Sequence, residues 1–345
     1  MDHTTLRRFL LGTTLLGLIV GWTVAAATSA TAGSRASVKA GRIAWKGFTS
    51  PGDFSSSSIF AANPDGSHRA RLTHPAAGIV DDLPDWSPDG SRILFERIFQ
   101  PDAPDLPTVA DEVMRVNSDG SGLTQVGSCT GDCVSNDDPQ YSPDGRQIAY
   151  SRLMHMPGGS LVLGIWVMGA DGSNPHQITQ LQAPTGSEDH EPAWSPDGSS
   201  IVFTRINDTA DPVNQQALFI VASSAGEPHR ITPWTLNAGG ANWSPSGSKI
   251  LFQSYRDCQC SVTSQAYTVL PDGSELTRLT KSGRNIEPNW SPDGRQIIYG
   301  HQPGVGRNHF PDLWEMDANG KNKAPVVQTK LWESEPDWGT APPTR

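Results

Sequence analysis

Charged residues are scarce in this chain of 345 residues, since Lys, Arg, Asp and Glu together make up 18%. An average soluble domain has about 25%. A content this low excludes a charge-driven disordered chain and a long coiled coil. Basic residues are scarcer than acidic ones, and the formal net charge is −10. Because nucleic acid is bound through clustered Lys and Arg, this balance argues against nucleic acid as a partner.

Long apolar runs are also lacking, except for residues 9–24. Arg7 and Arg8 precede that run, and A-T-A at residues 30–32 matches a cleavage site, which predicts an export signal over residues 1–32. An uncleaved anchor is the alternative, because the run almost reaches the length that spans a bilayer. With the signal removed, we expect a protein of charge −11 without a membrane span, located in the periplasm, at the cell wall or outside the cell.

Cysteine is rare as well: Cys129 and Cys133 stand in C-T-G-D-C, and Cys258 and Cys260 in C-Q-C. In an exported protein, an even number of cysteines favours disulfides, and one local bridge within each pair is the simplest arrangement. Neither spacing is typical of a structural zinc site. A four-thiolate zinc site and free thiols are the alternatives.

Glycine and proline are abundant, with 34 and 28 residues, so the chain turns often. Five segments share the pattern aromatic-S-P-[DS]-G, and their aromatic residues are Trp86, Tyr141, Trp194, Trp243 and Trp290. A sixth copy is split between the two ends of the chain, with E-P-D-W ending at Trp338 and G-R-I-A-W-K-G-F at residues 41–48. A period near 50 residues is typical of propeller blades.

Each repeat contains four predicted strands. The aromatic residue ends the first strand, S-P-D-G forms a tight turn, and an apolar run predicts a second strand buried on both faces. A third strand leads to a hairpin turn and a short fourth strand. We therefore predict an all-β fold, a six-bladed β-propeller of four-stranded antiparallel blades over residues 41–340. Pairing of the N- and C-terminal strands closes it and removes an open edge. Residues 33–40 are expected to be a linker and 341–345 a tail.

These W-S-P-D-G-x-x-I-x-F repeats resemble those of the TolB-like β-propeller family, and the resemblance covers residues 41–340. Similar propellers occur in tricorn-type and prolyl-oligopeptidase-type peptidases. TolB itself carries an α/β domain before its propeller, which this chain is expected to lack. The peptidases carry an α/β-hydrolase domain, whereas no G-x-S-x-G nucleophile elbow occurs here.

Ligand binding is expected on one face of the propeller. The loops that enter first strands and those that link second to third strands share this face, which we call the loop face, and long loops on a rigid scaffold usually carry function. The S-P-D-G turns form the opposite face, the turn face. The long segments of the loop face are 100–110, 129–137, 181–189, 206–215, 254–263 and 301–311.

Carboxylates recur three residues before the aromatic that ends the first strand, at Asp138, Glu191, Glu287 and Glu335. Because innermost strands line a propeller channel, these side chains are candidates for a ligand site at its loop-side mouth. Carboxylate oxygens also suit calcium. We expect Glu287 and Glu335 to be the metal ligands, because their repeats offer no arginine partner.

Arginines end three of the second strands, eleven residues after the aromatic. They are candidates for the same ligand site, and structural ion pairs within each repeat are the alternative. The expected pairs are Arg97 with Asp82, Arg152 with Asp138, and Arg205 with Asp189 or Glu191. His301 occupies the same position in its repeat, beside Glu287, where a His–Glu pair could perform acid–base chemistry.

Tryptophans at the repeat period are expected to pack between blades, whereas Trp234 and Trp332 fall outside the pattern and could contact a ligand. No residue is assigned as catalytic. We expect a monomeric, non-enzymatic exported propeller that binds a protein, a peptide or a cell-envelope glycan through the loop face. The alternative is a metal-assisted hydrolase or lyase that acts at the acidic channel mouth.

Overall fold

The computed structural model describes residues 41–50, 54–99, 111–180, 187–207, 215–255, 263–304 and 310–340, all within the unit Ala40–Arg345. Outside the described residues lie the predicted export signal, linker and tail, Cys258 and Cys260, and parts of the long loops. Within the described ranges, no helix has the length and apolar character that crossing a membrane requires.

The described residues form β-strands and one short 3-10 helix, which confirms the all-β class. The largest sheet contains β1 (Gly41–Phe48), β2 (Ser57–Ala62), β3 (Ala70–Arg71), β4 (Ile79–Trp86), β5 (Arg92–Phe99), β6 (Asp111–Asn117), β7 (Thr124–Gln125) and β24 (Glu333–Thr340). The next sheet contains β8 (Cys133–Tyr141), β9 (Gln147–His155), β10 (Leu161–Gly169) and β11 (His176–Gln177). A third contains β12 (Ser187–Trp194), β13 (Ser200–Asn207), β14 (Gln216–Ala222) and β15 (His229–Arg230). The helix η1 (Trp234–Leu236) precedes the fourth sheet, of β16 (Ala238–Trp243), β17 (Ile250–Ser254), β18 (Gln265–Val269) and β19 (Thr277–Arg278). The fifth contains β20 (Arg284–Trp290), β21 (Gln296–Gln302), β22 (Asp312–Asp317) and β23 (Ala324–Val327).

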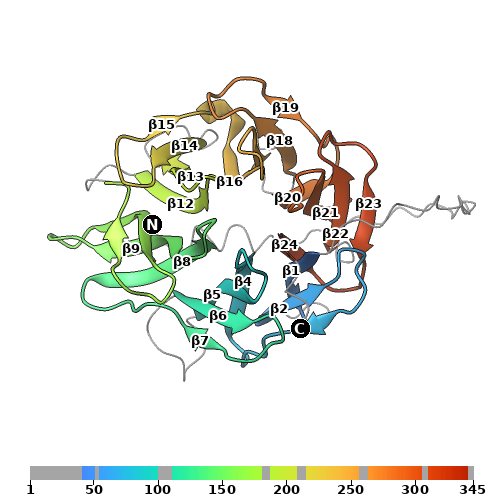
Figure 1. The fold of residues 1–345 in the computed structure, drawn as a ribbon, viewed down its shortest axis with the longest axis horizontal. Coiled ribbons are helices and arrows are strands. Elements are labelled where there is room, and N and C mark those ends of the chain that lie inside the picture. Colours follow the sequence, from blue (N-terminus) through green and yellow to red (C-terminus); the bar gives the residue numbers. More distant parts are fainter. Residues whose placement is uncertain are drawn as a thin grey trace, which may run out of the picture. The chain divides into compact units, whose positions relative to one another are not determined.

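The sheets follow one another around a ring, with the first strand of each repeat innermost (Figure 1). Four sheets have four antiparallel strands each. The eight-stranded sheet consists of two antiparallel runs of four, β24-β1-β2-β3 and β4-β5-β6-β7. A parallel pairing of Ser57 with Val80 places these two runs in one sheet. The arrangement is that of a β-propeller.

The two ends of the repeat region pair as the split repeat predicts. β24 lies antiparallel to β1, with Trp338 opposite Ile43 and Gly339 opposite Arg42. Trp338 is buried in a cluster with Trp45 and Ile298, so the last strand connects the first strand to the sheet of β20–β23. The ring is therefore closed by hydrogen bonding rather than left with an open edge.

The S-P-D-G sequence forms the turn between first and second strands through its side chains. Ser87 Oγ donates to Asp89 Oδ1 at 2.7 Å and accepts from the Arg92 N–H at 2.9 Å. Gly90 closes the turn with a φ of 68°, which glycine adopts without strain. The same serine bonds recur in the turns of Ser142, Ser195 and Ser291.

Apolar side chains pack between neighbouring sheets. One cluster joins Val202 and Leu218 of one sheet to Phe252 and Tyr267 of the next. The periodic aromatic residues contribute to these interfaces as expected and are at most 7% exposed, except Trp243, which is partly buried. Cys129 and Cys133 form the predicted local disulfide, whereas a Cys258–Cys260 bridge stays a prediction.

Candidate binding site at the channel mouth

A bulge interrupts every innermost strand at the position where the sequence places its carboxylates. The pairing register shifts by one residue there, for instance between Asp82 and Asp85. The residue three before the aromatic adopts a left-handed backbone in all six repeats: Leu83, Asp138, Glu191, Gly240, Glu287 and Glu335, with φ between 44° and 60°. A bulge re-aims side chains out of the regular alternation, and for residues other than glycine this backbone costs about 1–3 kcal/mol each.

All six of these positions line one central cavity of about 90 Å³. We call them the channel ring. One water needs about 10–15 Å³ of such space, so the cavity accommodates several waters or one extended side chain. Of the residues predicted for the ligand site, Asp138, Glu191, Glu287 and Glu335 line this cavity, whereas the three arginines and His301 do not.

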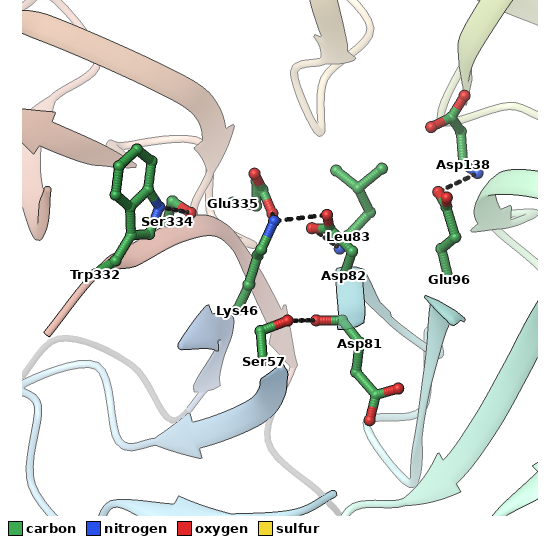
Figure 2. Close-up of polar contacts among 10 residues, drawn as sticks. All are labelled: Lys46, Ser57, Asp81, Asp82, Leu83, Glu96, Asp138, Trp332, Ser334 and Glu335. Atoms are coloured by element: carbon green, nitrogen blue, oxygen red, sulfur yellow. Dashed lines mark hydrogen bonds and ion pairs between the residues drawn. The ribbon is translucent and has the colours of Figure 1, made fainter. Parts of the chain in front are cut away.

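A buried lysine forms part of this site, and the sequence analysis missed it. Lys46 of β1 is 3% exposed, and its Nζ lies 2.6 Å from Asp82 Oδ2 and 3.3 Å from Glu335 Oε2 (Figure 2). Glu335 therefore has an internal cation as its partner, although no arginine is available. Asp82 Oδ1 also accepts from the Leu83 N–H at 2.8 Å.

Burial alone would lower the pKa of Lys46, but the charges of Asp82 and Glu335 outweigh burial and raise it. Burial also opposes ionisation of Asp82, yet the ammonium of Lys46 keeps the pKa of Asp82 below its usual value. Burial and the charge of Asp82 raise the pKa of Glu335 well above its usual value. Glu335 therefore keeps its proton to a higher pH than Asp82, and with Asp82 ionised and Glu335 protonated the ammonium of Lys46 balances the charge of the group.

Two further carboxyl groups of the channel ring, which we call its second side, have no internal cation among the described residues. Glu191 Oε2 accepts from the Gly240 N–H at 2.7 Å and from Thr204 Oγ1 at 2.8 Å. Glu287 Oε1 accepts from Gln253 Nε2. Among the described residues, no lysine or arginine forms an ion pair with either group. Burial and the charge of Glu191 raise the pKa of Glu287 to about 8, although the bond from Gln253 lowers it.

Gly240 leaves the space that Glu287 occupies. A Cβ at Gly240 would lie 2.6 Å from Glu287 Oε2, which is closer than real contacts allow, and its φ of 60° also suits glycine. Because this ring position carries glycine instead of an acidic residue, the side chain of Glu287 fits beside it.

Polar residues ten positions after the aromatic are the partners of the ring carboxyls. Ser151 Oγ donates to Asp138 Oδ2 at 2.9 Å, Thr204 to Glu191, and Gln253 to Glu287. Lys46 occupies the equivalent position in the split repeat. The sequence signal is a polar residue within an otherwise apolar second strand, as in I-L-F-Q and I-V-F-T.

Two of the three arginines that lie one residue further on, Arg97 and Arg205, form structural ion pairs. Arg205 pairs with Asp189, one of its two predicted partners, through bonds of 2.6 and 2.8 Å. Arg97 pairs with Asp81 at 2.7 and 2.9 Å, so the predicted pair with Asp82 is wrong. A regular antiparallel register would place Arg97 opposite Asp82, but the extra residue of the bulge moves its partner to Asp81.

Arg152 also differs from the prediction. Instead of pairing with Asp138, it donates to Cys133 Sγ at 3.2 Å, to the Tyr150 hydroxyl at 3.3 Å and to the Ser128 carbonyl at 3.0 Å. The residue opposite Arg152 is Asn136, which offers no charge. Arg152 therefore anchors the disulfide loop.

His301 does not contact Glu287, so the predicted acid–base pair is wrong. The bulge places Asn285 opposite His301, and Nδ1 lies 2.8 Å from Asn285 Oδ1. The imidazole packs edge-on against Trp314, and burial lowers the pKa of His301, which keeps the ring neutral near pH 7. Trp234, which the sequence analysis named as a possible ligand contact, packs against Phe219 in its own repeat.

The aspartates one residue before the aromatic hold neighbouring repeats together. Asp337 accepts from the Trp86 N–H at 2.7 Å, and Asp85 from the Tyr141 N–H at 2.8 Å. These acids have structural partners deeper in the channel. Among the described residues, Glu96, Asp111 and Asp137 also bring carboxylate oxygens within 4.8 Å of one another, a spacing that suits a metal ion.

The ring of four-stranded sheets and the carboxyl-lined channel define a β-propeller with an acidic central site. The model of the TolB beta propeller domain matches residues 112–342, about two thirds of the chain. The chain therefore belongs to the TolB beta propeller domain family.

Relatives and solved structures are consistent with this family. The Tol-Pal system protein TolB of Bordetella pertussis is 37% identical over 177 residues, which are 51% of this chain and 36% of that protein. The matched part thus spans about a third of that relative. The structure of TolB from Acinetobacter baumannii has a TM-score of 0.65 at 18% identity and covers 87% of this chain and 67% of its own. A putative TolB from Agrobacterium tumefaciens has a TM-score of 0.59 at 22% identity, over 84% and 90% of the two chains. At these identities the two structures support the fold alone.

Proposed function

We propose that this protein is an exported, monomeric, six-bladed propeller that binds a protein or peptide partner of the cell envelope at the loop-side mouth of its channel. The proposal counts the two runs of the eight-stranded sheet as separate blades. It assigns residues 1–32 to a cleaved signal, 33–40 to a linker, 41–340 to the propeller and 341–345 to a tail, and it places the protein in the periplasm, at the cell wall or outside the cell.

The observation that carries this proposal is the uneven channel ring. Lys46 neutralises Asp82 and Glu335, whereas Glu191 and Glu287 face the cavity with only neutral hydrogen-bond donors. Because the pKa of Glu287 is about 8, a cation supplied from outside would displace its proton and pair with both carboxylates. The cavity of about 90 Å³ admits one extended side chain, which suits a lysine or arginine of a bound peptide better than a glycan ring.

The name of the TolB relative supports an envelope partner, because it places that protein in the Tol-Pal system. The alternative is a metal-assisted hydrolase or lyase that uses a bound metal with His301 or Glu287 at the channel mouth. Since His301 binds Asn285 instead, the geometry favours binding over chemistry. Calcium at Glu287 stays part of the proposal as a small competitor for the same carboxyls, with Glu191 as the second ligand in place of Glu335, which Lys46 already contacts.

Site-specific photo-cross-linking in cells tests the binding face. A photoreactive residue replaces Ser282, an exposed residue before β20 on the loop face, and Ser199, an exposed residue of an S-P-D-G turn, is the matched control. We expect a discrete cross-linked product from position 282 and none from position 199. Equal labelling at both positions, or none at position 282, would contradict the proposal.

A further inference from the structure

Arg284 lies at the loop-side end of β20 with a buried nitrogen that lacks a hydrogen-bond acceptor. The side chain is half-buried, and within the described part of the chain its Nε is a buried atom without a partner. Its guanidinium carbon lies 5.8 Å from the ring centre of Trp332 in the neighbouring repeat. A buried donor that is left without an acceptor costs about 1–3 kcal/mol.

Three arginines at the ends of second strands have acceptors. Arg97 and Arg205 each hold an aspartate through two bonds, and Arg152 donates to three acceptors. Arg284 differs from them, because the flat face of its guanidinium packs on Trp332 while its Nε–H has no acceptor among the described residues. A guanidinium edge presents a fork of donors that matches a carboxylate.

Trp332 is held rigidly beneath this arginine. Its indole Nε1 donates to Ser334 Oγ at 2.8 Å, as Figure 2 shows, and its ring contacts Phe48 and Phe54 edge-on. Phe54 is 40% exposed, so an apolar surface continues outward from the indole. A fixed stacking partner keeps the guanidinium in place, which lowers the entropy cost of binding.

Glu287 of the channel ring lies on the same strand as Arg284, three residues further along β20. A ligand at this mouth therefore meets one unpaired cation beside carboxyl groups. A dianion such as phosphate would be repelled more strongly by those carboxyls than a single carboxylate.

We propose that Arg284, stacked on Trp332, is a carboxylate-binding subsite that receives an acidic group of the bound peptide, while the channel ring receives a basic one. This inference rests on the proposed function, since it assumes a peptide at the loop face. The carboxylate can come from a chain terminus or from an Asp or Glu side chain, and the chemistry is the same.

Titration of the full chain with synthetic peptides tests the subsite. The probes are acetyl-Lys-Gly-Phe-Gly-Ala with a free C-terminus, the same peptide as its amide, and an amide with Asp in place of the final Ala. The readouts are the NMR signals of the Arg284 Nε–H and the Trp332 Nε1–H. We expect the free acid or the Asp peptide to bind roughly tenfold more tightly than the plain amide. If the natural ligand supplies a C-terminal carboxylate, the free-acid peptide should bind more tightly. If it supplies an Asp or Glu side chain, the Asp-containing amide should bind more tightly.

Arg284→Gln should abolish the preference for a carboxylate, and Arg284→Lys should keep only part of it because the fork is lost. Arg295→Gln is the matched control, since Arg295 lies in an S-P-D-G turn with an 81% exposed side chain. Thermal melting checks that each variant folds. Equal affinity of all three peptides for the wild type, an unchanged preference in Arg284→Gln, or no response to any peptide would overturn the subsite. The proposed function is judged separately by cross-linking at position 282.

Discussion

The two sides of the channel ring differ in how their buried carboxyl groups are compensated. On one side, Lys46 lies between Asp82 and Glu335 and neutralises them from within. On the other side, Glu191 and Glu287 meet only neutral donors among the described residues, and Glu287 holds a proton near pH 7. The first side is complete without a ligand. The second side gains stability when a cation arrives, which is why we assign the ligand to it.

The largest effect is expected from removing the strand that carries Glu335. Deletion of residues 333–345 takes away β24, opens the edge of β1 and removes Trp338 from the core. We expect aggregation and loss of cooperative thermal unfolding, measured by light scattering and calorimetry. A truncated protein that melts like the full chain would contradict closure through β24.

Replacing the internal cation should also have a large effect. Lys46→Met leaves the buried carboxylate of Asp82 without a counter-charge, which costs about 3–5 kcal/mol. Chemical denaturation measures the loss, and Lys321→Met, at an exposed lysine, is the control. The double variant Lys46→Met/Asp82→Asn should recover much of the loss. If Lys46→Met were as stable as the wild type, Lys46 would not be the counter-charge of Asp82 and Glu335, and this part of the account would be wrong.

A smaller effect, opposite in sign, is expected on the other side of the ring. The pKa of Glu287 rises from 4.5 to about 8 on folding, so the protonated form favours the fold. This contribution is complete below pH 4.5 and is lost as the pH rises through about 8. Glu287→Gln should therefore melt a few °C above the wild type at pH 9 and show no such gain at pH 4.5. Glu275→Gln, at an exposed position, should show no gain at either pH. A gain that is the same at both pH values would rule out titration of Glu287 as its source.

Calcium should give the smallest effect. A divalent ion near Glu287 would stabilise the fold by mass action, so added calcium should raise the melting temperature of the wild type above its value in chelator. Glu287→Gln should respond less. An unchanged melting temperature in the wild type would show that the carboxyls bind no calcium.

Much of the fold could be predicted from the repeat, because S-P-D-G turns and buried apolar strands are local features. The closing pair of β1 and β24 followed from the split repeat, and the ring carboxyls from their fixed distance to the aromatic residues. The partners could not be predicted, because the bulge shifts the register by one residue, from Asp82 to Asp81 opposite Arg97 and from Ile286 to Asn285 opposite His301. Lys46 was missed because its aromatic residue, Trp338, lies at the other end of the chain.

The most direct test of the uneven ring is the titration of its carboxyl groups by carbon NMR, with Glu287→Gln and Asp82→Asn used to assign the signals. The account predicts a midpoint of about 8 for Glu287, whereas Asp82 stays ionised to below its usual pKa because Lys46 holds it. A midpoint near 4.5 for Glu287, with Asp82 titrating in the same range, would mean that the two sides are alike and would contradict the account.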